Sequence, residues 1–546
     1  ITSLDPIPLG HKVALVDFNG DGAAALSVGA PSYDGESNDR RLSGAIYVFH
    51  GNGHPFDPVF DLGQDAEADL VIVGAQPGDS LGSRIEVGDL DGDGTDDLVL
   101  GVPGGDGPEG VDADGDGSID TEGLQARGEV VVLFGGRPRA SPFDLRRPDP
   151  ALIRADAWFY GPHVFDRLGQ SVAVGDVDGD GSQDLVLGAN QGDGELGDRA
   201  DSGEGHVIYG ASFDFGRCPL EGGDPCQQDL RTDPGDLVLY GPEAGAELGR
   251  RLAVGDLSDD GIDDLALQLR FSDGPTGNRL QAGSVAVVYG GGTLPATLDL
   301  SDPANVDFTV HGANAGDVIG DELVLADLSN DGVADLLIGI SFADDDVDGT
   351  ENRQDTGEIS VVWGPPPVGG TELDLDPNGP DAGDFWTIRG RDASDGYGDT
   401  LAVGDVDGDG FADLMGGAPF SEGRQNETPG AGEIWVRYGT PALGRGAANE
   451  DLADQLAPYP VIWGGSQGDG LGTALLVGNI DLDPFIEHDE IIASTPFATA
   501  PDPDPGNPLD AGDRPGAGAV WLLTTYDNDE DGIRNLYDNC PNTFNP

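Results

Sequence analysis

Short apolar runs alternate with acidic and glycine-rich stretches along most of the chain, and the pattern repeats seven times. In each repeat an apolar residue followed by glycine precedes a short apolar run, an acidic stretch and a second apolar run. The second copy shows this order in Leu81-Gly82, 85–88, 89–97 and 97–101. Short runs rich in Val, Ile and Leu that are bounded by Gly and Asp are typical of β-strands. The pattern therefore predicts a chain built from short strands.

The acidic stretches set the length of the repeat. They begin 71 to 87 residues apart, so the unit is about 75 residues long, and their first residues are Asp17, Asp89, Asp176, Asp256, Asp327, Asp405 and Asn479. A third strand, such as 205–209, and a fourth strand, such as 237–240, complete each unit. Regular units of this size indicate a repeat architecture, which takes precedence over a division by length.

Four antiparallel strands repeated radially form a propeller blade, and a closed ring leaves only short protected edges. We therefore predict an all-β fold, a seven-bladed β-propeller with four-stranded antiparallel blades over residues 1–524. The seventh unit has three strands and changes character at Thr524, whereas Ile1 to Leu4 precede the first unit. We expect Ile1 to Leu4 to supply the outer strand of the last blade, so that their deletion opens the ring.

Three acidic stretches carry aspartate at positions 1, 3, 5 and 9 and glycine at the turn. Ca²⁺ takes six to eight oxygen ligands, and this spacing provides carboxylates with a backbone carbonyl at position 7. Three copies in one register favour metal binding over chance acidity. The expected ligands are Asp89, Asp91, Asp93 and Asp97; Asp176, Asp178, Asp180 and Asp184; and Asp405, Asp407, Asp409 and Asp413.

The other loops depart from this pattern. Two carry serine at position 3 and are expected to bind calcium more weakly: Asp256, Ser258, Asp260 and Asp264, and Asp327, Ser329, Asp331 and Asp335. The first has Asp17, Asn19 and Asp21 but Ala25 at position 9, which leaves its occupancy open. The seventh, 479–484, lacks the turn glycine and has an insertion before Glu490, so we expect a degenerate structural loop.

Two more candidate calcium loops lie between second and third strands. Asp112, Asp114, Asp116 and Asp120 have the full spacing, and Asp344, Asp346, Asp348 and Asn352 form a weaker version. In an up-and-down blade alternate connections fall on opposite faces, so these insertions should lie across the disc from the main loops. That face also holds the links between blades and is the better candidate for ligand contact. The alternative is that the insertions are solvated decoration, because surface loops tolerate length changes.

The order apolar-Gly, strand, Gly-Asp, calcium loop, strand and Gly-Ala-Pro resembles the FG-GAP repeat of integrin alpha-chain propellers and their bacterial relatives. Gly-Ala-Pro stands at 29–31 and 417–419, becomes Gly-Val-Pro at 101–103 and is lost at 268–270. The resemblance covers about residues 1–524. It implies seven blades with calcium between first and second strands, and usually a role in recognition or adhesion.

Residues 525–546 hold a further acidic loop with Asp527, Asp529, Asp531 and Asp538, followed by Asn539-Cys540-Pro541. This segment resembles the thrombospondin type 3 repeat, which implies a calcium-binding stalk. We expect the polypeptide to continue into further C-terminal stalk repeats.

Composition narrows the partners and the compartment. The formal net charge is -76, with 102 acidic and 26 basic residues, which excludes nucleic acid as a partner. No apolar run approaches the roughly 20 residues of a membrane span. Cys218 and Cys226 enclose a short loop and could form a disulfide, which would indicate an oxidising compartment, or remain two free thiols. The calcium loops lead us to expect an extracellular or cell-surface location. The start at Ile1 is consistent with signal-peptide removal or with an incomplete chain.

Nothing in the sequence resembles a catalytic constellation. The seven histidines are scattered, and no zinc pair, nucleophile elbow or phosphate loop occurs. We therefore expect no enzyme, with a polysaccharide-cleaving propeller ranked last. The first hypothesis is a recognition or adhesion head that binds a protein or glycan through the insertion face. The second is a structural subunit of a surface layer or filament that contacts copies of itself. An apolar patch on the insertion face would favour the first hypothesis, and a patch on a blade edge the second.

Overall fold

The computed structural model describes part of the chain. The described residues are 8–35, 40–51, 68–107, 126–145, 155–213, 215–217, 226–275, 277, 279–292, 294–344, 353–366, 372–379, 381–423, 426–453, 459–480, 489–499, 516 and 518–523.

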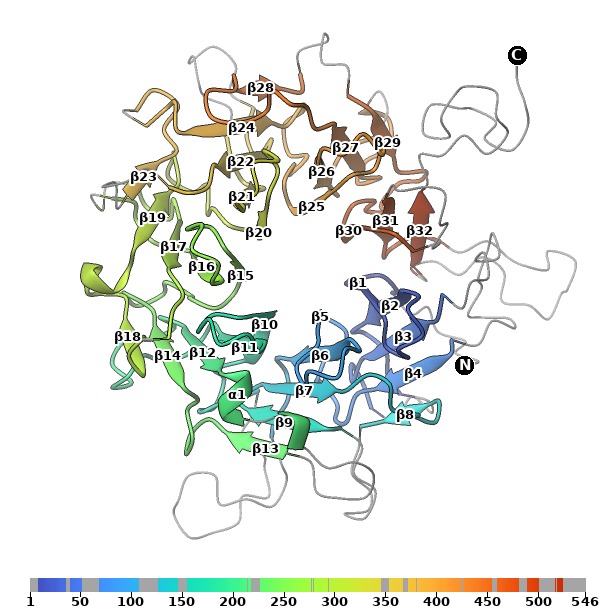
Figure 1. Cartoon of the computed structure of the whole chain (residues 1–546). Helices are drawn as coiled ribbons and strands as arrows, with labels where there is room; N and C mark the ends of the chain where they lie inside the picture. Colours follow the sequence, from blue (N-terminus) through green and yellow to red (C-terminus); the bar gives the residue numbers. More distant parts are fainter. Residues whose placement is uncertain are drawn as a thin grey trace, which may run out of the picture.

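Seven sheets are arranged in a ring, as the repeat predicts (Figure 1). The inner strands are β1 (Val13–Val16), β5 (Arg84–Gly88), β10 (Leu168–Gly175), β15 (Leu252–Gly255), β20 (Glu322–Ala326), β25 (Thr400–Gly404) and β30 (Leu475–Gly478). The second strands are β2 (Ala25–Ala30), β6 (Asp97–Val102), β11 (Asp184–Ala189), β16 (Asp264–Leu269), β21 (Asp335–Ile340), β26 (Asp413–Ala418) and β31 (Glu490–Thr495). Each blade is named below by its place in this order.

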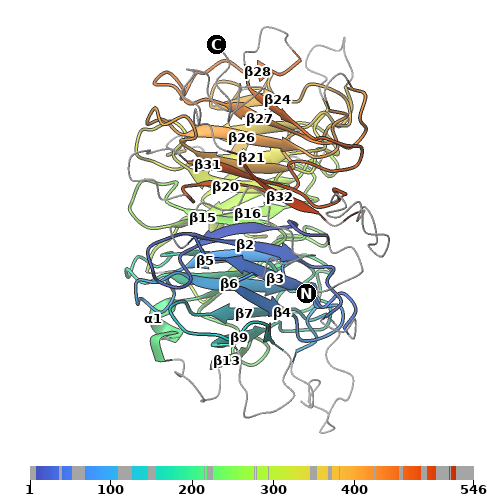
Figure 2. The ribbon, with the colours of Figure 1, turned by 90° about the vertical axis from the view of Figure 1, so that its right-hand side faces the viewer.

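Outside these lie the third and fourth strands. The third strands are β3 (Ala45–Phe49), β7 (Glu129–Leu133), β12 (Glu204–Ile208), β17 (Ser284–Val288), β22 (Glu358–Val362), β27 (Glu433–Arg437) and β32 (Ala519–Leu523). The fourth strands are β4 (Leu70–Val73), β9 (Ala157–Tyr160), β14 (Leu237–Tyr240), β19 (Phe308–His311), β24 (Phe385–Arg389) and β29 (Val461–Trp463). All four are antiparallel to their neighbours, and Figure 2 shows the ring from the side, with the strands running between its two faces.

The prediction of four-stranded blades is wrong for most of the ring. Five sheets have a fifth strand that pairs in parallel with the fourth, and it comes from the connection between the third and fourth strands of the next blade. These strands are β8 (Phe143–Asp144), β13 (Cys226–Asp229), β18 (Thr297–Asp299), β23 (Glu372–Asp374) and β28 (Glu450–Asp451). The sixth sheet has four described strands and the seventh has three. Segments of two to four residues carry too little periodicity to be recognised from sequence.

An arginine holds each fifth strand in place. Arg127, whose side chain is 2% exposed, donates to Asp229 Oδ1 at 2.5 Å and to the carbonyl oxygen of Gly161 after the fourth strand. The same arrangement recurs in the pairs Arg40–Asp144, Arg199–Asp299, Arg279–Asp374 and Arg353–Asp451. Each pair joins two adjacent blades at the rim of the ring.

Apolar side chains fill the spaces between adjacent blades. One cluster joins the last blade to the first, because Val13 and Val28 pack with Ala474 and Ile492. Leu9 also bridges to Gly518, as Leu81 does to Gly44 and Leu168 to Gly128 elsewhere in the ring. The ring therefore closes between blades 7 and 1, while the expected outer strand at Ile1 to Leu4 lies outside the described residues.

The glycines of the repeat mark where neighbouring backbones touch. A Cβ on Gly29 would lie 2.0 Å from the carbonyl oxygen of Gly82. Gly82 has a φ of +92°, a conformation that favours glycine. This contact links the Gly-Ala-Pro glycine of one blade to the apolar-Gly glycine of the next. Where the motif is lost at Gln268, the side-chain amide donates to the Ile319 carbonyl oxygen at 3.0 Å and connects the two blades instead.

Three short helical turns are described: α1 (Gly210–Phe213), η1 (Phe215–Arg217) and η2 (Pro303–Asn305). Within the described residues, none of the helices has the length and apolar character required to cross a membrane.

Candidate metal centres and the opposite face

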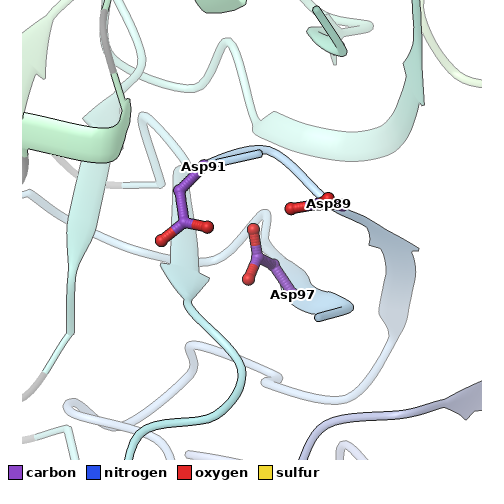
Figure 3. Close-up of side chains that lie close together, drawn as sticks. All are labelled: Asp89, Asp91 and Asp97. Carbon is purple, nitrogen blue, oxygen red and sulfur yellow. The ribbon is translucent and has the colours of Figure 1, made fainter. Parts of the chain in front are cut away.

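The acidic loops all connect an inner strand to a second strand and therefore lie on one face of the ring, here called the loop face. Three of them bring carboxylate oxygens within 4.8 Å of one another: Asp89, Asp91 and Asp97; Asp176, Asp178 and Asp184; and Asp405, Asp407 and Asp413. Figure 3 shows the first of these clusters, where the three side chains converge inside the loop. These are the three loops that the sequence ranks first.

Position 1 gives the loop its shape. The Asp89 carboxylate accepts hydrogen bonds from the backbone N–H of Asp93 at 3.0 Å and of Gly94 at 2.9 Å. The bond from the residue at position 6 recurs with Asp17, Asp176, Asp256, Asp327 and Asp405 as acceptors. Six loops therefore share one backbone form, including the first loop, which has no acid at position 9.

Position 9 is fully buried. Asp97 accepts from the backbone N–H of Leu90 at 2.8 Å and of Gly135 at 2.9 Å. Burial raises the pKa of Asp97, Asp184 and Asp413 to about 7, and that of Asp264 and Asp335 to about 6. A carboxyl that is costly to ionise in isolation suits a site where a cation supplies the missing charge.

Position 5 does not join the clusters. Asp93, Asp180 and Asp409 instead accept from the backbone N–H of position 7 in their loops, at 2.8 to 3.0 Å. In the structure these three aspartates brace the turn.

In the two serine loops, a different observation indicates a cation site. The hydroxyl oxygens of Ser258 and Ser329 are buried and have no hydrogen-bond partner. Buried polar atoms are almost always satisfied in folded proteins. Position 3 of these loops therefore fits a cation that takes oxygen ligands. At position 5, Asp260 and Asp331 accept from the backbone N–H of position 7, as in the other loops.

The first and seventh loops depart from the common pattern in different ways. In the first, Ala25 is buried at position 9 and Asn19 donates to Asp21 at 2.9 Å, so two candidate ligands satisfy each other. In the seventh, the backbone N–H of Ile480 donates to Glu490 Oε2 at 3.0 Å, the bond that Leu90 makes to Asp97. Glu490 thus stands at position 9, after the insertion that the sequence shows before it.

The remaining expected ligands fall mainly outside the described residues. This holds for Asp112, Asp114, Asp116 and Asp120 and for Asp527, Asp529, Asp531 and Asp538, and the thrombospondin type 3-like segment stays a prediction. Asp344 is described and accepts from the backbone N–H of Asp355 at 2.9 Å, as Asp193 does from Asp201 at 3.1 Å. In these connections the aspartate closes a turn. Cys226 is disulfide-bonded, and its partner lies outside the described residues.

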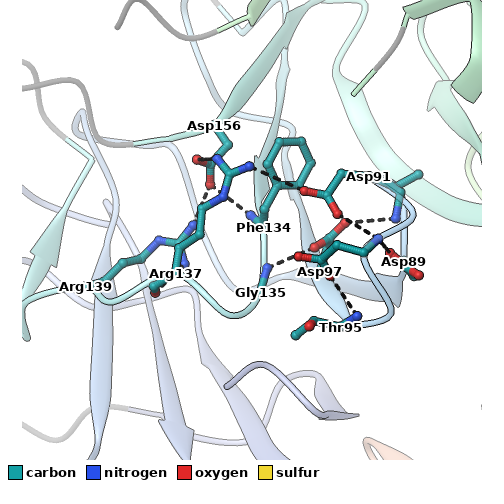
Figure 4. Close-up of polar contacts among 11 residues, drawn as sticks. Asp89, Asp91, Thr95, Asp97, Phe134, Gly135, Arg137, Arg139 and Asp156 are labelled. Carbon is teal, nitrogen blue, oxygen red and sulfur yellow. Dashed lines mark hydrogen bonds and ion pairs between the residues drawn. The ribbon is translucent and has the colours of Figure 1, made fainter. Parts of the chain in front are cut away.

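The loop of blade 2 has an arginine beside it. Arg137 Nη2 lies 3.3 Å from Asp91 Oδ2, and its Nη1 lies 2.5 Å from Asp156 (Figure 4). Arg139 contacts the other oxygen of Asp156 at 2.5 Å, and the Phe134 ring lies 4.5 Å below the Arg137 guanidinium. No sequence signal pointed to Arg137.

The opposite face, here called the insertion face, holds the connections between second and third strands and the links between blades. Eight of the ten exposed large apolar residues among the described residues lie there: Leu42, Val164, Phe165, Leu196, Leu280, Phe342, Phe420 and Phe497. The other two, Trp521 and Leu522, lie on β32. Phe342, Phe420 and Phe497 occupy one repeat position, two residues after the second strand, and are 44%, 60% and 60% exposed.

Charged side chains gather where the inner strands begin, on the same face. Lys12 and Arg251 lie 4.0 Å and 3.4 Å from Glu322, which brings blades 1, 4 and 5 together at the centre. Burial, reinforced by nearby Arg251, lowers the pKa of Arg84 to about 9. The sequence reading missed this group because its members come from four separate repeats.

Comparisons with known proteins find FG-GAP repeats in this chain and similarity to two groups of proteins over a third of its length. The model of the FG-GAP repeat matches residues 168–208 and 397–436, which lie in the first three strands of blades 3 and 6 and the turns between them. Human phosphatidylinositol-glycan-specific phospholipase D is 31% identical over 181 residues, which are 33% of this chain and 18% of that protein. The rat protein of the same name is 32% identical over 183 residues, with the same two shares. Human integrin alpha-IIb is 33% identical over 189 residues, 33% of this chain and 14% of that protein.

The chain thus spans less than a fifth of the length of these relatives. A solved structure of BBS1N in complex with ARL6DN aligns with 91% of this chain and 95% of its own, at a TM-score of 0.39 and 10% identity, which is too low to support any argument. The chain contains FG-GAP repeats and folds as an all-β, seven-bladed propeller, and its similarity to integrin alpha chains is distant.

These relatives also correct one expectation. The sequence reading found no catalytic constellation and expected no enzyme, whereas the human, rat and bovine proteins similar to a third of this chain are named as a phospholipase. The expectation was wrong because it rested on the absence of catalytic motifs within a propeller, and function is not determined by the fold alone.

Proposed function

We propose that this chain is the calcium-stabilised recognition head of an extracellular protein, which binds a protein or glycan ligand through its insertion face. The observation that carries the proposal is the contrast between the faces. Acidic clusters lie on one face, and eight exposed apolar side chains lie on the other.

Calcium suits the loop face because its ligands are hard oxygen atoms at alternating positions around a tight turn. Asp89, Asp91 and Asp97, with their equivalents in blades 3 and 6, would hold the ion in the strongest loops. Bound calcium would offset the repulsion between carboxylates that lie within 4.8 Å of one another. The serine loops would bind with one carboxylate fewer.

The insertion face suits ligand binding because the burial of exposed apolar side chains under a partner is favourable in free energy. Phe342, Phe420 and Phe497 come from three consecutive blades, so a single partner could contact all three. The acidity of the chain, with a net charge of -76, favours a neutral or basic ligand over an anionic one.

Two further candidates each rest on one observation. Trp521 and Leu522 on β32 are 51% and 37% exposed, which supports contact with a second copy at the edge of blade 7. The similarity to phosphatidylinositol-glycan-specific phospholipase D supports a propeller that belongs to a larger phospholipase and presents a glycan-bearing lipid to it.

A binding screen tests the three candidates together. The calcium-loaded protein is applied to glycan and protein arrays and to vesicles that carry phosphatidylinositol with or without its glycan, with Phe420→Ser/Phe497→Ser and Trp521→Ser as matched variants. The main proposal expects the double phenylalanine variant to lose at least tenfold in ligand affinity while Trp521→Ser binds normally. Binding that is insensitive to both phenylalanines would contradict it. Loss of self-association in Trp521→Ser would support the structural subunit, and cleavage of glycan-bearing lipid the phospholipase.

A further inference from the structure

We propose that Arg137 acts as a permanent positive charge beside the 89–97 loop. It holds Asp91 in the ligating position when calcium is absent, and it weakens calcium binding there relative to the 176–184 loop. This inference rests on the calcium binding of the proposed function, and it concerns how two loops with the same four aspartates differ.

The arginine is anchored independently of the loop. Asp156 accepts from Arg137 at 2.5 Å, from Arg139 at 2.5 Å and from the backbone N–H of Phe134 at 2.9 Å. The Phe134 ring supports the guanidinium from one side at 4.5 Å. Arg137 is therefore already in position when it meets Asp91, and little side-chain entropy is lost in forming that contact.

The contact leaves Asp91 able to bind a metal. Arg137 approaches Oδ2 at 3.3 Å, whereas Oδ1 accepts from the backbone N–H of Asp93 at 3.3 Å. The Asp91 side chain is only 7% exposed, so water screens the ion pair weakly. The hydrogen bond from Arg137 fixes the orientation of the Asp91 carboxylate, as groups that contact metal ligands commonly do for those ligands.

The 176–184 loop lacks this feature. Within the described part of the chain, no arginine or lysine forms an ion pair with Asp178, and the nearby Asp180, Asp176 and Asp236 all raise its pKa. At Asp91, Arg137 opposes the same effect of Asp93 and Asp89. One extra positive charge near the ion reduces the attraction of the loop for calcium and reduces the repulsion between its carboxylates when calcium is absent.

Hydrogen–deuterium exchange measured by mass spectrometry resolves the loops separately in the intact chain. Amide exchange in peptides covering 89–97 and 176–184 is followed from chelator to millimolar calcium. We expect the 89–97 loop to exchange more slowly in chelator and to reach its protected state at about three- to tenfold higher calcium. In Arg137→Met the 89–97 midpoint should move down toward that of 176–184, which itself should not change.

Arg139→Met is the control, because it removes a similar contact to Asp156 without touching Asp91. It should leave the 89–97 midpoint where it is. If Arg137→Met does not fold, Arg137→Gln removes the charge and keeps a hydrogen-bond donor. An unchanged or higher midpoint for 89–97, with 176–184 still protected by calcium, overturns the inference alone. Failure of calcium to protect either loop overturns the proposed function as well.

Discussion

The two faces of the ring use equivalent backbone positions in opposite ways. On the loop face, six loops repeat the same bond from position 6 to the aspartate at position 1. On the insertion face, the position of Phe342, Phe420 and Phe497 also holds phenylalanine in blade 4, as Phe271. In the first three blades it holds Ser32, Gly104 and Gln191. Uniform chemistry is expected where a face holds the ring together, and varied chemistry where a face distinguishes a ligand.

The loop face also connects one blade to the next. The backbone N–H of Asp17 donates to Asp96 Oδ2 of the following loop at 2.8 Å, and that of Asp176 donates to Asp263 at 2.9 Å. A disturbance in one loop therefore reaches its neighbour. The insertions also reach the next blade, through pairs such as Arg199–Asp299, but their tips, such as Leu196 at 80% exposure, lie in solvent.

Removal of calcium, which acts on the loop face, should have the largest effect on the stability of the protein. Chelation should lower the melting temperature on the order of 10 °C, because each of several sites loses about 2–3 kcal/mol of binding free energy linked to folding. Calorimetry with chelator, followed by excess calcium, checks both the loss and its recovery. An unchanged melting temperature on chelation would mean that the aspartate clusters do not hold structural calcium.

Substitutions at two loop positions sharpen the comparison within the loop face. Asp97→Ala should destabilise the calcium-loaded protein by about 3 kcal/mol, because it removes a ligand and leaves two buried N–H groups unpaired. Asp17→Ala should cost below about 1 kcal/mol, since its loop has no acid at position 9 and the turn at 19–22 is exposed. Urea unfolding of both variants measures the difference, and equal losses would contradict the ranking of the loops.

The sequence was sufficient for the elements that repeat and insufficient for those that depend on a partner far along the chain. The loops at Asp89, Asp176 and Asp405 carry all their chemistry within nine residues, so spacing alone located them. The fifth strands consist of two to four residues and exist only because the preceding blade offers an edge. Arg137 is 46 residues from Asp91, and no local pattern connects them.

The rim of the ring allows a test that involves neither the calcium loops nor the exposed phenylalanines. Arg127→Met should destabilise the protein by about 2 kcal/mol, because it leaves the Gly161 carbonyl unpaired and detaches Asp229, whose side chain is 25% exposed. A double-mutant cycle with Asp229→Asn, measured by urea unfolding in calcium, gives the coupling between the two side chains. A coupling near zero would show that β13 stays in place without the arginine.

The smallest expected effect is a pH dependence that arises on the insertion face. Burial, reinforced by Glu129 and Glu358 respectively, raises the pKa of Asp79 and of Asp317 to about 8. Their pKa in the unfolded chain is about 3.9, so only the folded protein keeps these protons between the two values. Their contribution to stability is therefore complete below about pH 4 and lost as the pH rises through 8.

In saturating calcium, which keeps the loop aspartates ionised, the melting temperature should fall by a few degrees, about 2–4 °C, between pH 6 and pH 9. Asp79→Asn should flatten part of this slope because it fixes the neutral state, whereas Asp355→Asn, at an exposed carboxylate on the same face, should leave the slope unchanged. A melting temperature that rises over this range, or an unchanged slope in Asp79→Asn, would show that Asp79 is ionised in the folded protein. In that case a cation near Glu129 would be needed to stabilise the pair, and the insertion face would share the chemistry of the loop face.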